Sequence, residues 1–360
     1  MQKENKPVFC WKKLAPVFWI YLFILGLELL KKTSLSLAPN LTNILSSAIN
    51  TNPIKALSAG WLLTSIFQSS GAIDSLSLTL MANSIISLRA VIFIIMGATI
   101  GTTITALIIS LLTKAKKRDF RHGFEIGTSA TIYNVLIIAI FFILEITFKE
   151  LSSITQVINS FIHTPKIGFI PDLVSFITSP VINPLSKISF KPLVLLIAFL
   201  LLLVSLRFLS KSVVQAIGGE KQTKEIIRKY FSSKTKSFFI GIGITAIVFS
   251  SSITIGLLVP LTMSRLITLK KAIPFILGAE IGTMTDVLLA SIIIGKSITL
   301  SLALMYLIML IIGALIFLPN TSIIFNLTKY VSKHLLNISR KRAVLYLITF
   351  ITIPLIILLI

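Results

Sequence analysis

The chain has 360 residues, of which 55% are hydrophobic, and its mean hydropathy is +0.97. Apolar runs of this length exclude a soluble domain and predict an all-α polytopic membrane protein, with one membrane domain over residues 1–360 and roughly eight to ten membrane-embedded segments. The formal net charge of +22 does not indicate a nucleic-acid partner. The basic residues gather in short loops between apolar segments, where they suit cytoplasmic loops and contact with the lipid bilayer.

The predicted elements begin with a retained helix at 14–30, which Lys12 and Lys13 precede and which lacks a small-residue cleavage site. Residues 31–54 follow as an amphipathic connector. The apolar stretch 55–86 is interrupted by polar residues and glycine. Non-helical backbone at membrane depth needs protein or water partners, so we predict a broken helix or re-entrant hairpin buried within the protein. The interruptions are Gln68, Ser69, Ser70, Gly71 and Asp74.

The rest of the chain alternates spanning helices with connectors. The predicted order is a helix at 88–112, a basic loop at 114–121, a helix at 123–147, a poorly patterned segment at 149–190, a helix at 192–210 and a basic loop at 211–236. A second interrupted hairpin at 237–267 and a helix at 271–294 follow. The last elements are spans near 298–318 and 343–360, with a basic loop at 320–342 between them.

The interrupted hairpin and the helix after it occur twice in the sequence. Residues 60–106 align with 241–287 at an offset of 181 without a gap, and sixteen of the 47 positions are identical. The best match is GATIGT (97–102) over GAEIGT (278–283). A duplicated unit in a very apolar chain favours a transporter whose site lies at the interface of the repeats.

We place repeat one at about 14–147 and repeat two at about 192–318. Three predicted spans separate the two hairpins, and an odd number of crossings makes them enter the membrane from opposite sides. The distribution of Lys and Arg agrees with this topology, because it places the N-terminus and the basic loops in the cytoplasm. We therefore predict inverted repeats, each with a re-entrant hairpin followed by a transmembrane helix.

Each repeat would bring a Ser-rich break and a GAxIGT turn into the middle of the membrane. Broken helices present free N–H groups that suit a small oxyanion, while their free carbonyls, together with Gln68, can coordinate a hard cation such as Na⁺. An isolated Ser pair usually serves helix packing, whereas its duplication beside a matching turn favours a site. The hydroxyls that can both donate and accept there are Ser69, Ser70, Ser250, Ser251 and Ser252.

Acidic residues inside the membrane are a functional hypothesis by default, because burying a charge there is costly. Asp74, Glu280 and Asp286 lie within the repeats and are candidate coupling acids, through a cation or a proton. We expect Glu125 and Glu145 to lie at the membrane boundaries instead. The sequence contains no nucleophile beside a base and no phosphate loop, and Cys10 is its single cysteine. We therefore predict that the chain is not an enzyme and needs no cofactor.

The segment TSIFQSSGA (64–72), followed by GATIGTTITA (97–106) and duplicated in the second half, resembles the type II sodium-dependent inorganic phosphate cotransporters. That family carries paired TA-x-x-QSSSA and GANIGTT-x-TA motifs, and the resemblance covers both repeats and their spacing. It implies that phosphate and sodium sites are lined by Gln68, Ser69, Ser70, Ser250, Ser251 and Ser252 and completed by Thr102, Thr103 and Thr283. The chain resembles the bacterial form without a PhoU-like domain, which implies a bacterial inner (plasma) membrane.

The chain departs from the family motifs at four positions. Repeat two has Phe249 in place of Gln, repeat one has Gly71 in place of the third Ser, and the Asn of GAN is Thr99 in one repeat and Glu280 in the other. Exchanging amides for a carboxylate alters the cation site, so coupling to H⁺ instead of Na⁺ is an open alternative.

These features together predict a secondary active transporter that carries inorganic phosphate with Na⁺ by alternating access. Cation binding near Gln68, Thr99 and Glu280 would lower the cost of bringing an oxyanion to mid-membrane. A carrier of the same fold for another small anion, and a non-transporting divergent relative, are the other readings. The sequence does not predict an oligomeric state.

Overall fold

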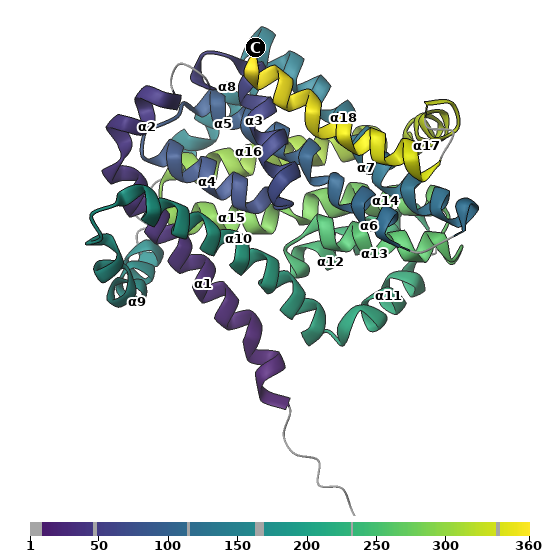
Figure 1. The fold of residues 1–360 in the computed structure, drawn as a ribbon, viewed down its shortest axis with the longest axis horizontal. Coiled ribbons are helices and arrows are strands. Elements are labelled where there is room, and N and C mark those ends of the chain that lie inside the picture. The colour runs from purple at the N-terminus through teal and green to yellow at the C-terminus, as the bar shows by residue number, and fades with distance from the viewer. Residues whose placement is uncertain (1–8, 46–48, 114–115, 163–168, 232, 336–338) are drawn as a thin grey trace, which may run out of the picture.

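The computed structural model describes residues 9–45, 49–113, 116–162, 169–231, 233–335 and 339–360, and within these ranges every regular element is helical. Seven of the described helices are long and apolar enough to cross a membrane, which agrees with a polytopic membrane protein. Figure 1 shows shorter helices crowded at the centre of the molecule, with α1 on one side of them and α18 on the other.

The apolar stretch of the first repeat is interrupted, as predicted, and we call its two helices with their break a hairpin. Asn52 caps the N-terminus of α3 by accepting hydrogen bonds from the backbone of Ile54 and Lys55, and Pro53 occupies the first turn, where it needs no N–H partner. Helix α3 ends at Phe67, and α4 begins at Ser70 after a two-residue break. The elements of this half are α1 (Phe9–Ser36), α2 (Ala38–Leu45), α3 (Pro53–Phe67), α4 (Ser70–Ala82), α5 (Leu88–Thr102) and α6 (Ile104–Leu112).

The middle of the chain holds two long apolar helices and three shorter ones. These are α7 (Lys117–Phe148), α8 (Glu150–Phe161), α9 (Phe169–Ser186), α10 (Lys191–Ala216) and α11 (Gly219–Tyr230). Helix α10 packs along α1, and the two helices share an apolar cluster around Phe23 and Leu202. This pair flanks the central helices in Figure 1.

The second repeat again forms an interrupted hairpin, in which α12 ends at Val248 and α13 begins at Ser251. The elements of this half are α12 (Lys234–Val248), α13 (Ser251–Met263), α14 (Leu269–Gly282), α15 (Met284–Ile294), α16 (Ser297–Phe317), α17 (Thr321–Tyr330), a π-helical turn (Val331–Leu335) and α18 (Arg340–Leu359).

The two hairpins pack on their following helices through equivalent residues. A Cβ atom at Gly97 would lie 1.8 Å from the backbone oxygen of Leu57, and one at Gly278 would lie 2.0 Å from that of Phe238. Both members of the second pair stand 181 positions after those of the first, so the offset read from the sequence recurs in the packing of α3 on α5 and of α12 on α14. These close approaches need glycine, because a side chain would meet backbone.

The sequence prediction was wrong about three connectors. The segment 149–190 contains α8 and α9, the loop 211–236 contains α11, and the loop 320–342 contains α17, although residues 163–168, 232 and 336–338 lie outside the described part. These helices are amphipathic and pack one stripe on the protein, as Ile227 of α11 does with no exposed surface. Residues 114–115 of the remaining basic loop also lie outside the described part.

Candidate functional site

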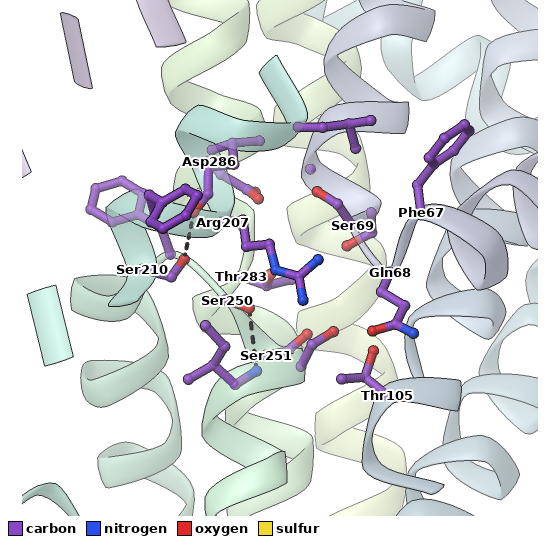
Figure 2. Close-up of a pocket in the computed structure, with 18 of the residues that line it drawn as sticks. Phe67, Gln68, Ser69, Thr105, Arg207, Ser210, Ser250, Ser251, Thr283 and Asp286 are labelled. Carbon is purple, nitrogen blue, oxygen red and sulfur yellow. Dashed lines mark hydrogen bonds between the residues drawn. The ribbon is translucent and has the colours of Figure 1, made fainter. Parts of the chain in front are cut away.

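A cavity of about 620 Å³ lies where the two hairpin breaks meet. Gln68, Ser69 and Ser70 line it from repeat one, and Ser250, Ser251 and Ser252 line it from repeat two. The structure therefore brings together two segments that are far apart in the chain, 68–70 and 250–252. Figure 2 shows the two breaks facing the same space.

The backbone at the two breaks has the same conformation. Gln68 and Phe249 both end their helices in the left-handed region, with φ of 55° and 59°. Ser69 and Ser250 then cap α4 and α13, accepting hydrogen bonds from the N–H groups of Ala72 (3.4 Å) and Ile253 (3.3 Å). Two helix N-termini consequently point their free N–H groups and positive dipole ends into one cavity, an arrangement suited to an anion.

Each hairpin break contacts the GAxIGT turn of the other repeat. The Ser252 and Thr102 hydroxyls are 2.9 Å apart, and either can donate. In the reverse direction, the carboxylate of Asp286, four residues after Gly282, lies against Gly71. Thr283 also lines the cavity, while Thr103 accepts a hydrogen bond from Thr131 (2.9 Å) outside it.

Arg207 supplies a positive charge that our sequence interpretation missed. It extends from α10, outside both repeat cores (the aligned stretches 60–106 and 241–287), and Figure 2 shows its guanidinium group reaching between Ser69 and Ser250. It forms no hydrogen bond or ion pair with any residue in the described ranges. The signal was present in the sequence, because an arginine within the predicted span 192–210 is an intramembrane charge of the kind that marks a site.

A second polar cluster lies away from this cavity. Asn134 of α7 donates to the backbone oxygen of Thr99 (2.8 Å) and to Glu280 Oε1 (3.2 Å), and the Thr99 hydroxyl is hydrogen-bonded to that of Tyr306. Thr99 and Glu280 are equivalent residues of the two repeats, so the cluster joins both turns through α7 and α16.

The buried acids divide into two groups by their partners. Glu125 and Glu145 are fully buried in the protein, and cations pair with both: Lys329 lies 2.6 Å from Glu125, and Arg89 lies 3.5 Å from Glu145. Such pairs are structural. Asp74, Asp286 and Glu280 are at most 5% exposed, and no described cation lies within 4 Å of them.

Two of these acids also have oxygens without a hydrogen-bond partner among the described residues. They are Oδ1 of Asp74 and Oδ1 of Asp286, and the Ser251 hydroxyl, which is 1% exposed, is in the same situation. A buried polar atom without a partner costs about 1–3 kcal/mol. Asp286 and Ser251 both line the cavity, so a ligand there is a candidate partner for these two atoms.

A further cavity of about 570 Å³ adjoins the first and shares Lys211 and Ile253 with it. Its polar lining also includes Thr113, Gln215 and two residues of α11, Glu220 and Lys224. The second cavity thereby lies between the first cavity and the connectors that precede α7 and follow α10.

Known proteins resemble the chain over these elements. The model of the Na⁺/Pi-cotransporter family matches residues 22–163 and 201–339. Proteins named sodium-dependent phosphate transport protein 2B from Pongo abelii and Homo sapiens are each 31% identical over 164 residues, 45% of this chain and 24% of theirs. Sodium-dependent phosphate transport protein 2A from Ovis aries is 28% identical over 164 residues, 45% of this chain and 26% of its own. The matched part thus covers about a quarter of these relatives' length. No solved structure matches the chain.

Proposed function

Because the chain belongs to the Na⁺/Pi-cotransporter family, we propose that it carries inorganic phosphate together with Na⁺ across a cell membrane by alternating access. The observation that carries the proposal is the convergence of two capped helix N-termini and the Arg207 guanidinium on one cavity. The relatives named above are sodium-dependent phosphate transport proteins, which agrees with an oxyanion as cargo.

The oxyanion binds between the two hairpin breaks. Backbone N–H groups at the starts of α4 and α13 donate to its oxygens, and the free hydroxyl of Ser251 adds a donor. Arg207 provides charge and two parallel N–H groups, a fork geometry that matches phosphate. The remaining hydroxyls, those of Ser70 and Thr283, complete the lining.

The coupling cation binds at the buried acids. Glu280, with the amide of Asn134 and the Thr99 oxygens, offers Na⁺ a set of hard oxygen ligands, and its negative charge has no described cation partner. The same isolation favours H⁺ as a second candidate, since a buried carboxylate without a cation is also neutralised by a proton. Asp74 and Asp286 are the other candidate coupling acids.

Alternating access follows from inverted repeats, in which the two halves exchange conformations. The second cavity would be the entrance on the cytoplasmic side, because it reaches connectors that the positive-inside rule places there. The structure would then be the inward-facing state. The protein would be an integral, multi-pass protein of a cell membrane, and the bacterial inner membrane stays a prediction from the sequence.

Uptake of radiolabelled phosphate into proteoliposomes tests the proposal, with Na⁺ outside compared with K⁺ outside at fixed pH. We expect uptake to need the Na⁺ gradient. Uptake that is equal in both buffers and follows an imposed pH gradient would assign coupling to H⁺. No uptake with Na⁺ outside, with K⁺ outside or with a pH gradient would refute phosphate transport.

Replacing Arg207 tests whether this residue binds phosphate at the proposed site. We expect Arg207→Gln to reduce phosphate affinity at least tenfold, because a hydrogen bond to a charged group contributes about 1.5–3 kcal/mol. Arg207→Lys should restore only part of it, since lysine lacks the fork. Arg228→Gln on the exposed face of α11 is the matched control. Equal affinities for the Arg207→Gln variant and the wild type would remove Arg207 from the site.

A further inference from the structure

Two departures from the repeat pattern meet in the cavity. Repeat two has Ser252 where repeat one has Gly71, and repeat one has Thr105 where repeat two has Asp286. In the structure Gly71 and Asp286 are in contact, and both line the cavity. The missing serine of one repeat and the extra carboxylate of the other therefore occupy one place.

The contact between Gly71 and Asp286 makes these two departures from the repeat pattern depend on each other. A Cβ atom at Gly71 would lie 2.0 Å from Asp286 Oδ2 and 2.8 Å from its Cγ, far inside van der Waals contact. A serine at position 71 and the aspartate in its present position exclude each other. The carboxylate thus fills the space in which repeat one would otherwise carry a hydroxyl, and it replaces a group that both donates and accepts with one that, when ionised, only accepts.

We propose that Asp286 makes the cavity selective for tetrahedral oxyanions that still carry a proton, phosphate and arsenate, against sulfate, which carries none. The inference rests on the proposed phosphate site and specifies which oxyanions that site admits.

Selectivity at this site follows from the balance of donors and acceptors around the ligand. Arg207 and the starts of α4 and α13 present donors, which any oxyanion can satisfy. Asp286 lines the same cavity, and its buried Oδ1 has no hydrogen-bond partner in the described chain, so a donor from the ligand would satisfy it. Near neutral pH, phosphate and arsenate keep at least one P–OH or As–OH group that can donate to it.

Sulfate offers only acceptor oxygens at this pH. Placing one of them against Asp286 leaves the carboxylate unpaired and brings two negative groups together in a buried site. A site that hydrogen-bonds a ligand hydroxyl can reject an analogue without it by several orders of magnitude.

Competition for bound radiolabelled phosphate on the purified, detergent-solubilised full chain tests the inference without any substitution. We expect unlabelled arsenate to displace phosphate at concentrations similar to those of phosphate itself, and sulfate to need concentrations at least about a hundredfold higher. Displacement by sulfate at concentrations similar to those of arsenate would overturn the proposal, because it would mean that Asp286 presents no unshared acceptor to the ligand.

Variants then test whether Asp286 is the cause. Asp286→Asn keeps the size of the side chain and adds a donor, so we expect sulfate to compete at least tenfold better than in the wild type. Gly71→Ser with Asp286→Thr gives each repeat the residue of the other and removes the clash. We expect this double variant to admit sulfate as well and to be more stable than Gly71→Ser alone. Asp119→Asn is the matched control, because Asp119 pairs with Arg265 away from both cavities.

The outcomes keep this proposal apart from the proposed function. Unchanged discrimination in both the Asp286→Asn and the double variant would overturn the role of Asp286 even if Na⁺-driven uptake is present. The role of Asp286 is supported if the wild type binds phosphate and arsenate but not sulfate and the variants no longer discriminate against sulfate. This holds even if no Na⁺-driven uptake is observed. If the variants do not fold, displacement of phosphate by sulfate as readily as by arsenate in the wild type still overturns the proposal.

Discussion

The two interrupted hairpins share a backbone and differ in chemistry. Both end their first helix with a non-glycine residue in the left-handed region and begin the second with a serine cap. Yet the equivalent side chains are an amide and a phenyl group at Gln68 and Phe249, and a hydroxyl and a carboxylate at Thr99 and Glu280. The duplicated part is therefore the scaffold that aims two helix N-termini at one cavity, whereas the side chains that we propose to choose cargo and cation differ between the two copies.

The largest effect should come from glycines on which both copies depend. Gly97→Ala and Gly278→Ala each place a Cβ atom within 2.0 Å of a backbone oxygen, so we expect a loss of more than about 3 kcal/mol of stability in either repeat. Gly243→Ala on α12 is the control, since nothing lies within 4 Å of its Cβ position. Thermal unfolding of the purified variants measures the difference. Tolerance of alanine at Gly278 but not at Gly97 would show that the second copy is not packed in the same way.

The next largest effect should come from Glu280, and it should differ from the effect of Thr99, the equivalent residue in the other GAxIGT turn. Glu280→Gln removes the only charge in the cluster of Asn134, Thr99 and Tyr306, so we expect Na⁺-driven uptake to fall at least tenfold while phosphate binding persists. Thr99→Val in the equivalent position removes one hydroxyl. It should reduce Na⁺-driven uptake several-fold at most, because a neutral hydrogen bond contributes about 1 kcal/mol.

Uptake with Na⁺ and with K⁺ outside measures both variants. If Glu280→Gln transports like the wild type in Na⁺ but no longer responds to a pH gradient, the residue carries a proton rather than binding Na⁺. Equal losses in the two variants would mean that the turns contribute alike, despite the carboxylate in one of them.

Much of this scaffold could be predicted from the sequence, because its signals are local. The polar interruption at Gln68 in an apolar run predicted the break, and the offset of 181 recurs in the glycine contacts of Gly97 and Gly278. The part that could not be predicted depends on contacts between distant segments. The proximity of Gly71 to Asp286, and the entry of Arg207 from a helix outside both repeat cores, are set by how α10 and α15 pack on the hairpins.

The prediction of the connectors was wrong for a different reason. Four prolines and little apolar periodicity suggested irregular structure in 149–190, but α9 keeps Pro180 and Pro184 inside a helix that packs on α1 and α15. Tertiary packing outweighed local propensity there.

A smaller effect distinguishes two serines that the sequence places in one class. Ser69 caps α4, so we expect Ser69→Ala to cost about 1 kcal/mol of stability. The Ser251 hydroxyl makes no hydrogen bond within the described chain, so Ser251→Ala should leave stability unchanged, or raise it slightly, and reduce phosphate affinity several-fold. Thermal unfolding and phosphate binding on the same preparations measure both quantities. Intact phosphate affinity in Ser251→Ala would show that its hydroxyl does not face the ligand.

The smallest effect should follow from restoring symmetry at the helix ends. Phe249→Gln adds to repeat two the amide that repeat one has, but it also removes a phenyl group that packs against the apolar cluster of α1 and α10. A new hydrogen bond contributes about 1 kcal/mol and the lost burial costs a similar amount, so we expect a change in the KM for phosphate of no more than about threefold. Gln68→Phe loses the amide that faces Thr105 in Figure 2 and should have the larger effect. A gain of tenfold or more in Phe249→Gln would mean that the second amide position still belongs to the binding site, and that divergence of the repeats has cost this protein affinity.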